Sequence, residues 1–138
     1  MARTTTVKNL IIKQSVVTQS QTLTDSDAGR TFFLNAAGGF TVTLPKPRAG
    51  VGFEFIVKTA PTTLSYTIAT NGASAVIVGG VTSSDINKGD ADFASTAVAS
   101  AVFMVNRAQI ADSLKLISDG TYWYASGFTG IVDAIQLT

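Results

Sequence analysis

Apolar and polar residues alternate along most of this chain, the pattern of β-strands that bury one face and expose the other. The clearest case is FTVTLP at 40–45, where every second residue is apolar and Pro45 ends the strand because it has no backbone N–H to donate. The same alternation recurs in GFEFIVK at 52–58 and in LSYTIAT at 64–70. Further strands are predicted for AVIV at 75–78, AVFMVN at 101–106 and SLKLI at 113–117.

Helical signals are few. The stretch LTDSDAG at 23–29 can form one capped turn, and we interpret the alanine-rich stretch at 89–101 as a loop that leads into a strand. Short strands separated by turn residues predict an all-β fold, an antiparallel β-sandwich or jelly-roll-like single domain, with a closed barrel as the alternative. We expect an N-terminal arm over residues 1–20 and the β-sandwich domain over residues 21–138.

The stretch SDGTYWYASG at 118–127 holds the only tryptophan of the chain. If Asp119 and Gly120 form a two-residue hairpin turn, Leu116 lies opposite Trp123, and both side chains point to the same face. A buried indole contributes about 4–6 kcal/mol of gross hydrophobic stabilisation, so we predict a core position for Trp123.

The opposite face of this hairpin is also apolar. It carries Ile117, Tyr122 and Tyr124, which we predict to be a subunit interface. The amino-acid composition also favours a subunit interface, because only 14% of the residues are charged, against roughly 25% in ordinary soluble domains. A homo-oligomer would cover apolar surface that so few charges leave exposed.

The net charge of +1 leaves no broad basic surface for nucleic acid, and no apolar run is long enough to cross a membrane. We therefore expect neither nucleic acid nor membrane as a partner. The N-terminal segment is basic on its own, since three cations precede the first acid, Asp25. It is either an exposed terminus or an arm that docks on another chain. The candidate contact residues of the arm are Arg3, Lys8, Leu10, Ile11, Ile12 and Lys13.

The chain lacks the side chains of most active sites. Without histidine or cysteine it has no ordinary base for a nucleophilic triad and no ligands for zinc or copper. The pairs Asp25/Asp27 and Asp90/Asp92 suggest the start of calcium loops, but neither continues with the distal glutamate of such a loop. Glu54 is the only glutamate. We expect turn aspartates, no cofactor and no enzymatic activity.

Three stretches in the same order carry a family resemblance: SDAGRTFFLNAAGGFTVTLPKPRAGVGFEFIVKTAPTT, TIATNGASAVIVGG and SDGTYWYASG. Together they resemble the head decoration proteins of tailed bacteriophages, over most of the chain from about residue 22 to residue 127. Related β-rich modules occur in head and tail fibres.

The resemblance implies a β-sandwich protein, often a homotrimer, that is made in the host cytoplasm and sits on the capsid surface of the virion. Its partner would be the major capsid protein, and the arm could add a strand to that protein or to a neighbouring subunit. No catalytic residue carries over. The expected function is therefore capsid stabilisation, and the alternative is a fibre module that binds a host-surface glycan or receptor through Tyr122 and Tyr124.

Overall fold

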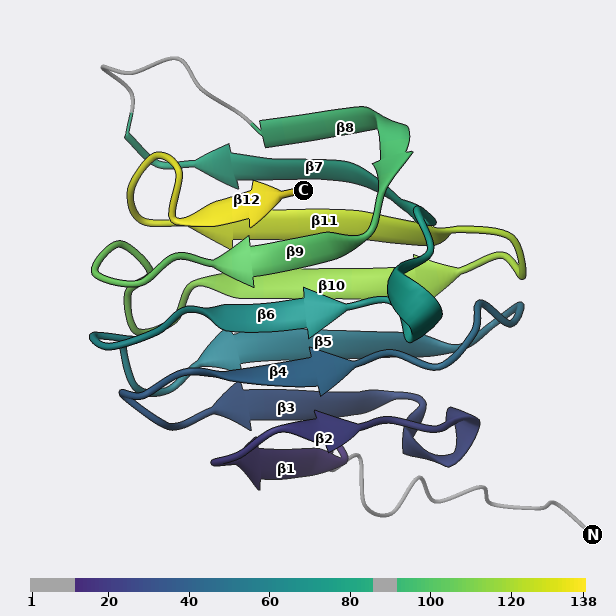
Figure 1. Ribbon diagram of the computed structural model, residues 1–138, viewed down its shortest axis with the longest axis horizontal. Helices are drawn as coiled ribbons and strands as arrows, with labels where there is room; N and C mark the ends of the chain where they lie inside the picture. Colours follow the sequence, from purple (N-terminus) through teal and green to yellow (C-terminus); the bar gives the residue numbers. More distant parts are fainter. Residues whose placement is uncertain (1–11, 86–91) are drawn as a thin grey trace, which may run out of the picture.

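The computed structural model describes residues 12–85 and 92–138, with the backbone alone for Asp92. Two β-sheets pack face to face, and no element in these ranges is a long helix (Figure 1). One sheet has seven strands in the order β1-β3-β5-β10-β11-β7-β8, and the other has five in the order β12-β9-β6-β4-β2. The predicted all-β sandwich is confirmed.

The predicted strands are found with small shifts at their ends. In spatial order, the seven-stranded sheet contains β1 (Gln14–Val17), β3 (Arg30–Leu34), β5 (Gly52–Val57), β10 (Ser113–Ser118), β11 (Trp123–Thr129), β7 (Ile77–Ser83) and β8 (Asp92–Val98). The five-stranded sheet contains β12 (Ile135–Leu137), β9 (Ser100–Phe103), β6 (Tyr66–Ala69), β4 (Phe40–Thr43) and β2 (Gln21–Thr22). Two short 3-10 turns, η1 (Asp25–Asp27) and η2 (Asn71–Ala73), lie in connections.

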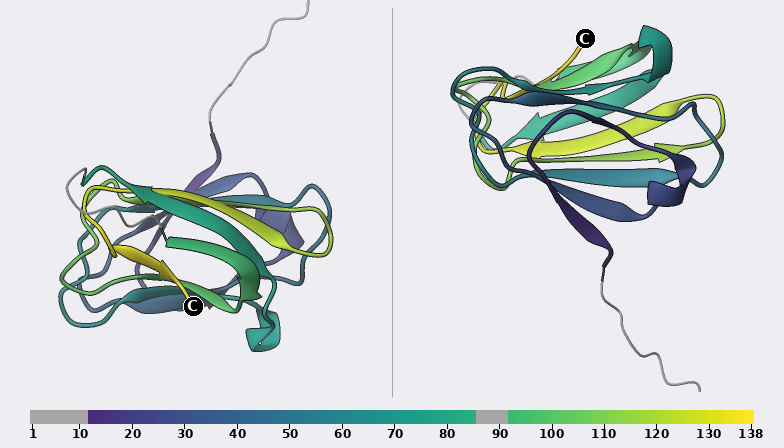
Figure 2. Two further views of the ribbon diagram at one scale, coloured as in Figure 1. Left: turned by 90° about the horizontal axis from the view of Figure 1, so that it is seen from above. Right: turned by 60° about the horizontal axis from the view of Figure 1, so that its bottom comes forward.

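Strand direction differs from the prediction of an antiparallel sandwich. The first six strands alternate between the two sheets, so β1, β3 and β5 pair in parallel in one sheet while β2, β4 and β6 pair in parallel in the other (Figures 1 and 2). This half of the chain winds as a flattened coil. The strands β9 and β10 are each antiparallel to both of their neighbours.

The core fills the space between the sheets. Its largest fully buried side chains include Trp123, Tyr66, Phe32 and Phe55. The rings of Phe32 and Phe55 stack with centroids 5.5 Å apart. The phenol of Tyr66 donates a hydrogen bond to the Thr59 carbonyl at 2.6 Å and accepts one from the Ala36 amide at 2.9 Å. Burial raises the pKa of this phenol, and its hydrogen bonds tie two connections to the core.

The alanine-rich stretch at 89–101 is not the predicted loop where the structure describes it. Residues 92–98 form the edge strand β8, and β9 begins at Ser100. Ala94 and Val98 are partly buried and pack against the core. Small side chains suffice here because an edge strand covers only the rim of the sandwich.

Part of the predicted arm belongs to the sheet. Residues 14–17 form β1 at the edge opposite β8, and Val17 is buried. The amide of Thr31 also donates to the Lys13 carbonyl at 2.9 Å. A truncation that spares the fold must therefore end before Lys13.

Candidate interaction surface on the seven-stranded sheet

The two outer faces of the sandwich differ in chemistry. Across the five-stranded sheet, the strand register places Thr41, Thr67, Val102 and Gln136 in one outward row. This face is mainly polar, as expected for a solvated sheet face. The outer face of the seven-stranded sheet, which we call the apolar face, has a different composition.

Eight of the nine large apolar side chains that are exposed in residues 12–85 and 93–138 lie on the apolar face or at its rim. The exception is Leu64, in the connection that enters β6. The eight are Ile12, Val16, Phe93, Ile110, Ile117, Tyr122, Tyr124 and Phe128. Single exposed apolar residues are ordinary on protein surfaces, but a contiguous group of them is typical of an interaction site.

Strand register arranges the apolar face in rows that run across the strands. Two apolar rows flank a polar one, in which Glu54 of β5 lies directly opposite Lys115 of β10. The first apolar row contains Val16, Phe33, Ile56 and Phe128, interrupted by Ser113. The second contains Ile117, Tyr124 and Val78.

The end of the apolar face near β8 forms a groove with aromatic sides. Tyr122, Tyr124 and Phe93 line it, and Gly79 lies among its lining residues. Gly79 has a φ of 129°, and a Cβ at this position would collide with the carbonyl oxygen of Ala125 on the neighbouring strand. Only glycine fits this close approach of the two strands.

The end near β1 forms a second groove with aliphatic sides. Val16, Ile56 and Ile110 line it together with Phe33, and Lys58 is also among its lining residues. Ile110 is 70% exposed. The two ends of one sheet face therefore carry unlike apolar surfaces.

The hairpin between β10 and β11 places the predicted interface residues on the apolar face. Ile117 and Tyr124 are cross-strand partners on this face, and Tyr122 lies at the hairpin tip. Trp123 is fully buried on the opposite face, as predicted. The predicted two-residue turn is wrong, however, because Ser118 pairs with Trp123 and four residues connect the strands. The register differs by two positions, which preserves the faces, since side chains alternate with a period of two.

Asp119 holds this longer turn. Its Oδ1 accepts hydrogen bonds from the amides of Thr121 at 2.8 Å and Tyr122 at 2.9 Å, and its Oδ2 accepts one from the Tyr124 hydroxyl at 3.0 Å. The hydrogen bonds from the Tyr122 and Thr121 amides hold the pKa of Asp119 below its usual value. The bond to Asp119 in turn raises the pKa of Tyr124. The carboxylate thus fixes how Tyr124 is presented on the apolar face.

Replacing Asp119 with alanine is expected to lower the melting temperature at neutral pH. Asp119→Asn keeps an Oδ1 acceptor and is therefore expected to lower the melting temperature much less. Because the pKa of Asp119 is depressed in the folded protein, its stabilisation is present above the unfolded pKa and is lost as the pH falls through the folded value. Thermal melts followed by circular dichroism from pH 2 to 7 measure both effects. Equal melting temperatures for wild type and Asp119→Ala at pH 7 would contradict the role of the turn.

The residues predicted for the arm are only partly described. Arg3, Lys8, Leu10 and Ile11 lie outside the described residues. Ile12 and Lys13 are exposed, and Ile12 reaches the rim of the apolar face near Glu54 and Lys115.

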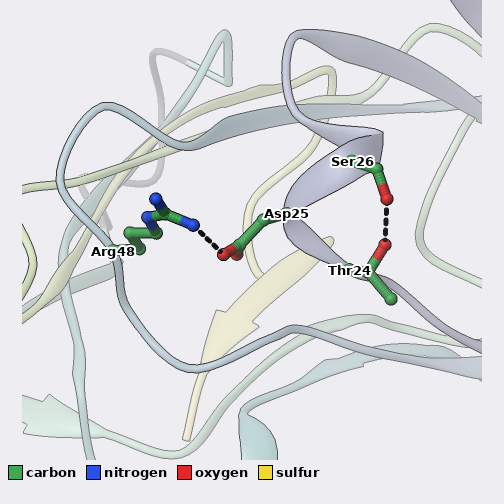
Figure 3. A network of polar contacts seen from close by, with 4 residues as sticks. All are labelled: Thr24, Asp25, Ser26 and Arg48. Carbon is green, nitrogen blue, oxygen red and sulfur yellow. Dashed lines mark hydrogen bonds and ion pairs between the residues drawn. The ribbon is translucent and has the colours of Figure 1, made fainter.

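The aspartates of DSDAG serve local structure, and Figure 3 shows the contact of the first of them, Asp25, with Arg48. Asp25 forms an ion pair with Arg48 at 2.9 Å, and the Asp27 carboxylate accepts a hydrogen bond from the Thr24 amide at 2.9 Å. The hydroxyls of Thr24 and Ser26 also bond each other at 2.7 Å. These contacts explain why aspartates occur in this turn. Asp90 and the side chain of Asp92 lie outside the described part of the chain.

Within the described ranges, no three acidic, histidine or cysteine side chains come together in a way that could hold a metal ion. None of the helices in these ranges is long and apolar enough to cross a membrane. No protein-family model, curated protein or solved structure was found to match the chain.

Proposed function

We propose that this chain is a structural protein of a virus particle, which binds the outer surface of the assembled capsid and stabilises it. The observation that carries the proposal is the apolar face, where exposed large apolar side chains gather on a domain with very few charges. The sequence resemblance to bacteriophage head decoration proteins supplies the capsid as partner. We propose no catalytic role.

Such a protein acts by adding contacts to a lattice. Each contact removes apolar surface from water, at roughly 25 cal/mol per Å². When copies are linked in an oligomer, binding at one site raises the effective concentration at the next, so weak single contacts give firm attachment. The major capsid protein would thereby be braced across its own subunit boundaries.

The proposal predicts many copies per particle. Quantitative mass spectrometry of purified virus particles, normalised to the major capsid protein, is expected to give a copy number equal to that protein or a simple fraction of it. The purified chain is expected to bind assembled shells and not free capsid subunits. A count limited to a few copies per particle would contradict decoration of the lattice.

The N-terminal segment is proposed to contribute to attachment. Deleting residues 1–11 leaves β1 and the carbonyl of Lys13 in place, so the melting temperature is expected to stay unchanged while binding to shells is lost. Sedimentation of shells with full-length and truncated protein measures this difference. Equal binding of both proteins would show that the arm does not contact the shell.

A fibre module that binds a host-surface glycan is the second candidate. It is favoured by one observation, the exposed rings of Tyr122 and Tyr124 beside the Asp119 carboxylate. Sugar rings commonly stack on aromatic side chains while their hydroxyls bond neighbouring carboxylates. A low copy number together with binding to a glycan array that Tyr122→Ala abolishes would favour this candidate over decoration.

A further inference from the structure

The connection between β6 and β7 carries an asparagine followed by a glycine, Asn71 and Gly72, in the short 3-10 turn η2. Asparagine is one of the thermally labile residues of proteins, because the next backbone nitrogen can attack its side-chain amide. Glycine leaves that nitrogen unobstructed, since it has no Cβ and adopts backbone conformations that other residues rarely adopt. In a folded protein, the attack depends on how the two reacting groups are held.

Both reacting groups are free in this turn. Asn71 and Gly72 are exposed, and among the described residues no hydrogen bond engages the Asn71 carboxamide or the Gly72 N–H. A Cβ at Gly72 would meet no atom within 4 Å, so the space beside the peptide bond is open. Neither the nitrogen nor the carboxamide has to break a contact before the two approach each other.

The turn is also loosely closed. Gly72 has a φ of 63° and a ψ of 24°, which takes the chain out of right-handed helical geometry. The hydrogen bond from the Ser74 amide to the Asn71 carbonyl measures 3.4 Å, against about 2.9–3.0 Å for an ordinary N–H···O bond. The backbone at Asn71 can therefore rotate toward the geometry of attack at little cost.

The other asparagines in the described ranges, Asn35 and Asn106, are held differently. The backbone amide that follows Asn35 donates to the Tyr66 hydroxyl at 2.9 Å, and the one that follows Asn106 donates to the Met104 carbonyl at 3.1 Å. Attack by either nitrogen first breaks a hydrogen bond, at a net cost in free energy. Of the asparagines in the described part of the chain, Asn71 alone precedes an unbonded amide.

We propose that Asn71 is a site of spontaneous chemical modification, at which its carboxamide is lost and an aspartate or isoaspartate remains. The Gly72 nitrogen loses its proton to a base in the solvent and bonds to Cγ of Asn71. The Cγ–Nδ2 bond breaks, and Nδ2 takes up a proton from water and leaves as ammonia. Water then opens the cyclic imide. Addition at Cγ gives aspartate, and addition at the backbone carbonyl gives isoaspartate, in which the main chain runs through Cγ.

The modification places a new charge in a polar cleft. Asn71 lines this cleft together with Lys46, Arg48 and Asp25, and Arg48 pairs with Asp25 there at 2.9 Å (Figure 3). The formal net charge of +1 falls by one with each modified chain and becomes zero. Exposed ion pairs contribute little to stability, so the new carboxylate changes mainly the surface charge.

The fold is expected to survive the modification, because the ends of the turn are held from outside it. Thr70 is buried, and its hydroxyl bonds to the Ser74 carbonyl at 2.6 Å and to the Ala99 carbonyl at 3.0 Å. Its backbone amide also donates to the Ala99 carbonyl at 3.0 Å. The extra main-chain carbon of an isoaspartate is thus confined to an exposed turn.

Ageing of the purified full-length chain tests the proposal. Wild type and Asn71→Gln, whose longer side chain closes the corresponding ring much more slowly, are incubated at mildly alkaline pH beside a synthetic peptide of residues 66–76. Digestion and tandem mass spectrometry locate each asparagine that has exchanged its NH2 group for OH, and enzymatic methylation counts isoaspartate. Circular dichroism melts compare the fresh and the aged proteins.

In the folded wild type, residue 71 is expected to convert within about tenfold of the rate of the peptide, which is the population cost of breaking one hydrogen bond. Asn35 and Asn106 are expected to stay intact over the same period. The Asn71→Gln protein is expected to gain no isoaspartate at residue 71. The melting temperature of the aged wild type is expected to match that of the fresh protein.

Three outcomes would overturn the proposal. Conversion of residue 71 slower than that range, or none, while the peptide converts would show that the turn protects Asn71. Conversion of Asn35 or Asn106 as fast as Asn71 would show that hydrogen bonding of the next amide does not select the site. A melting temperature that falls in step with conversion would contradict a turn held by Thr70. Each of these outcomes leaves the capsid proposal standing, because shells and copy number are measured separately.

Discussion

Replacing Trp123 with alanine is expected to lower the free energy of unfolding by about 3–5 kcal/mol, the usual cost of deleting a large buried aromatic side chain. The indole is fully buried, and its ring centroid lies 5.6 Å from that of Phe53, on the inner face of the same sheet. Trp123 sits at the start of β11, opposite Ser118 on β10 and Ile77 on β7. A cavity at this point therefore weakens three strands of the seven-stranded sheet.

Two further substitutions test whether the loss of stability comes from core packing of the indole. The indole N–H of Trp123 has no acceptor in the described part of the chain, so Trp123→Phe gives up no hydrogen bond and is expected to lose less than the alanine variant. Tyr124→Ala, on the neighbouring exposed position, is expected to cost under about 1 kcal/mol. Urea denaturation followed by circular dichroism measures all three. Similar losses for Trp123→Ala and Tyr124→Ala would contradict a core position for the indole.

Sequence pattern predicted which side chains face the core, because alternation depends only on parity within a strand. Trp123, Leu116 and Phe53 are buried as the pattern indicates, even though the hairpin turn is longer than predicted. Asp119 and Gly120 are compatible with a two-residue turn, but Asp119 instead accepts two amides of a four-residue connection. A register change of two positions leaves every face unchanged.

Strand direction could not be predicted in this way. Alternating residues fit a parallel or an antiparallel neighbour equally well, and the parallel winding of β1–β6 depends on how each connection crosses between the sheets. The prediction of a loop at 89–101 is wrong because strand formation there also depends on a neighbouring strand. Alanine and serine have weak strand propensities, and it is the pairing of β8 with β7 that holds them in a strand.

The candidate surface was predicted only at the hairpin. Ile117 and Tyr124 are close in sequence, and their shared face follows from local alternation. Phe93 and Val16 come from strands at opposite edges of the same sheet, so their common face becomes visible only once strand order is known. The one local signal was an isolated large apolar residue among small or polar neighbours, as at Phe93 in DFAST.

The role of Asp112 also could not be predicted from the sequence, because it depends on a contact with a residue far along the chain. In the sequence this residue is one of several aspartates that lie in connections between strands, yet in the structure only 3% of its surface is exposed. Its Oδ2 accepts a hydrogen bond from the Gln109 amide and its Oδ1 accepts one from the Gly130 amide, each at 2.8 Å. The carboxylate thus joins the connection before β10 to the one after β11. Nothing in the local sequence indicates the contact with residue 130.

Replacing Asp112 with alanine is expected to cost about 2–3 kcal/mol, because two backbone amides lose a charged acceptor and the connections separate. Asp25→Ala is the matched control. Its carboxylate is 39% exposed and pairs with Arg48 at the surface, so its loss is expected to stay under about 1 kcal/mol. Chemical denaturation at pH 7 measures both. A loss no larger at Asp112 than at Asp25 would show that the buried carboxylate does not hold the two connections together.

The pH dependence of Asp112→Asn tests the same site in a different way. Burial raises the pKa of Asp112 above its ordinary value of 3.8, and the hydrogen bonds from Gln109 and Gly130 oppose this shift only in part. The folded protein therefore holds the proton more tightly than the unfolded chain does. From this residue alone, the free energy of unfolding falls as the pH rises from the unfolded pKa through the raised folded pKa, and it is constant above that value. Asparagine does not titrate, so the variant lacks this pH dependence. As the pH rises over that window, the free energy of unfolding of the wild type is therefore expected to fall relative to that of Asp112→Asn, and the difference is expected to be constant at higher pH. A difference that stays the same from pH 3 to pH 7 would show that the carboxylate is not destabilised by its burial.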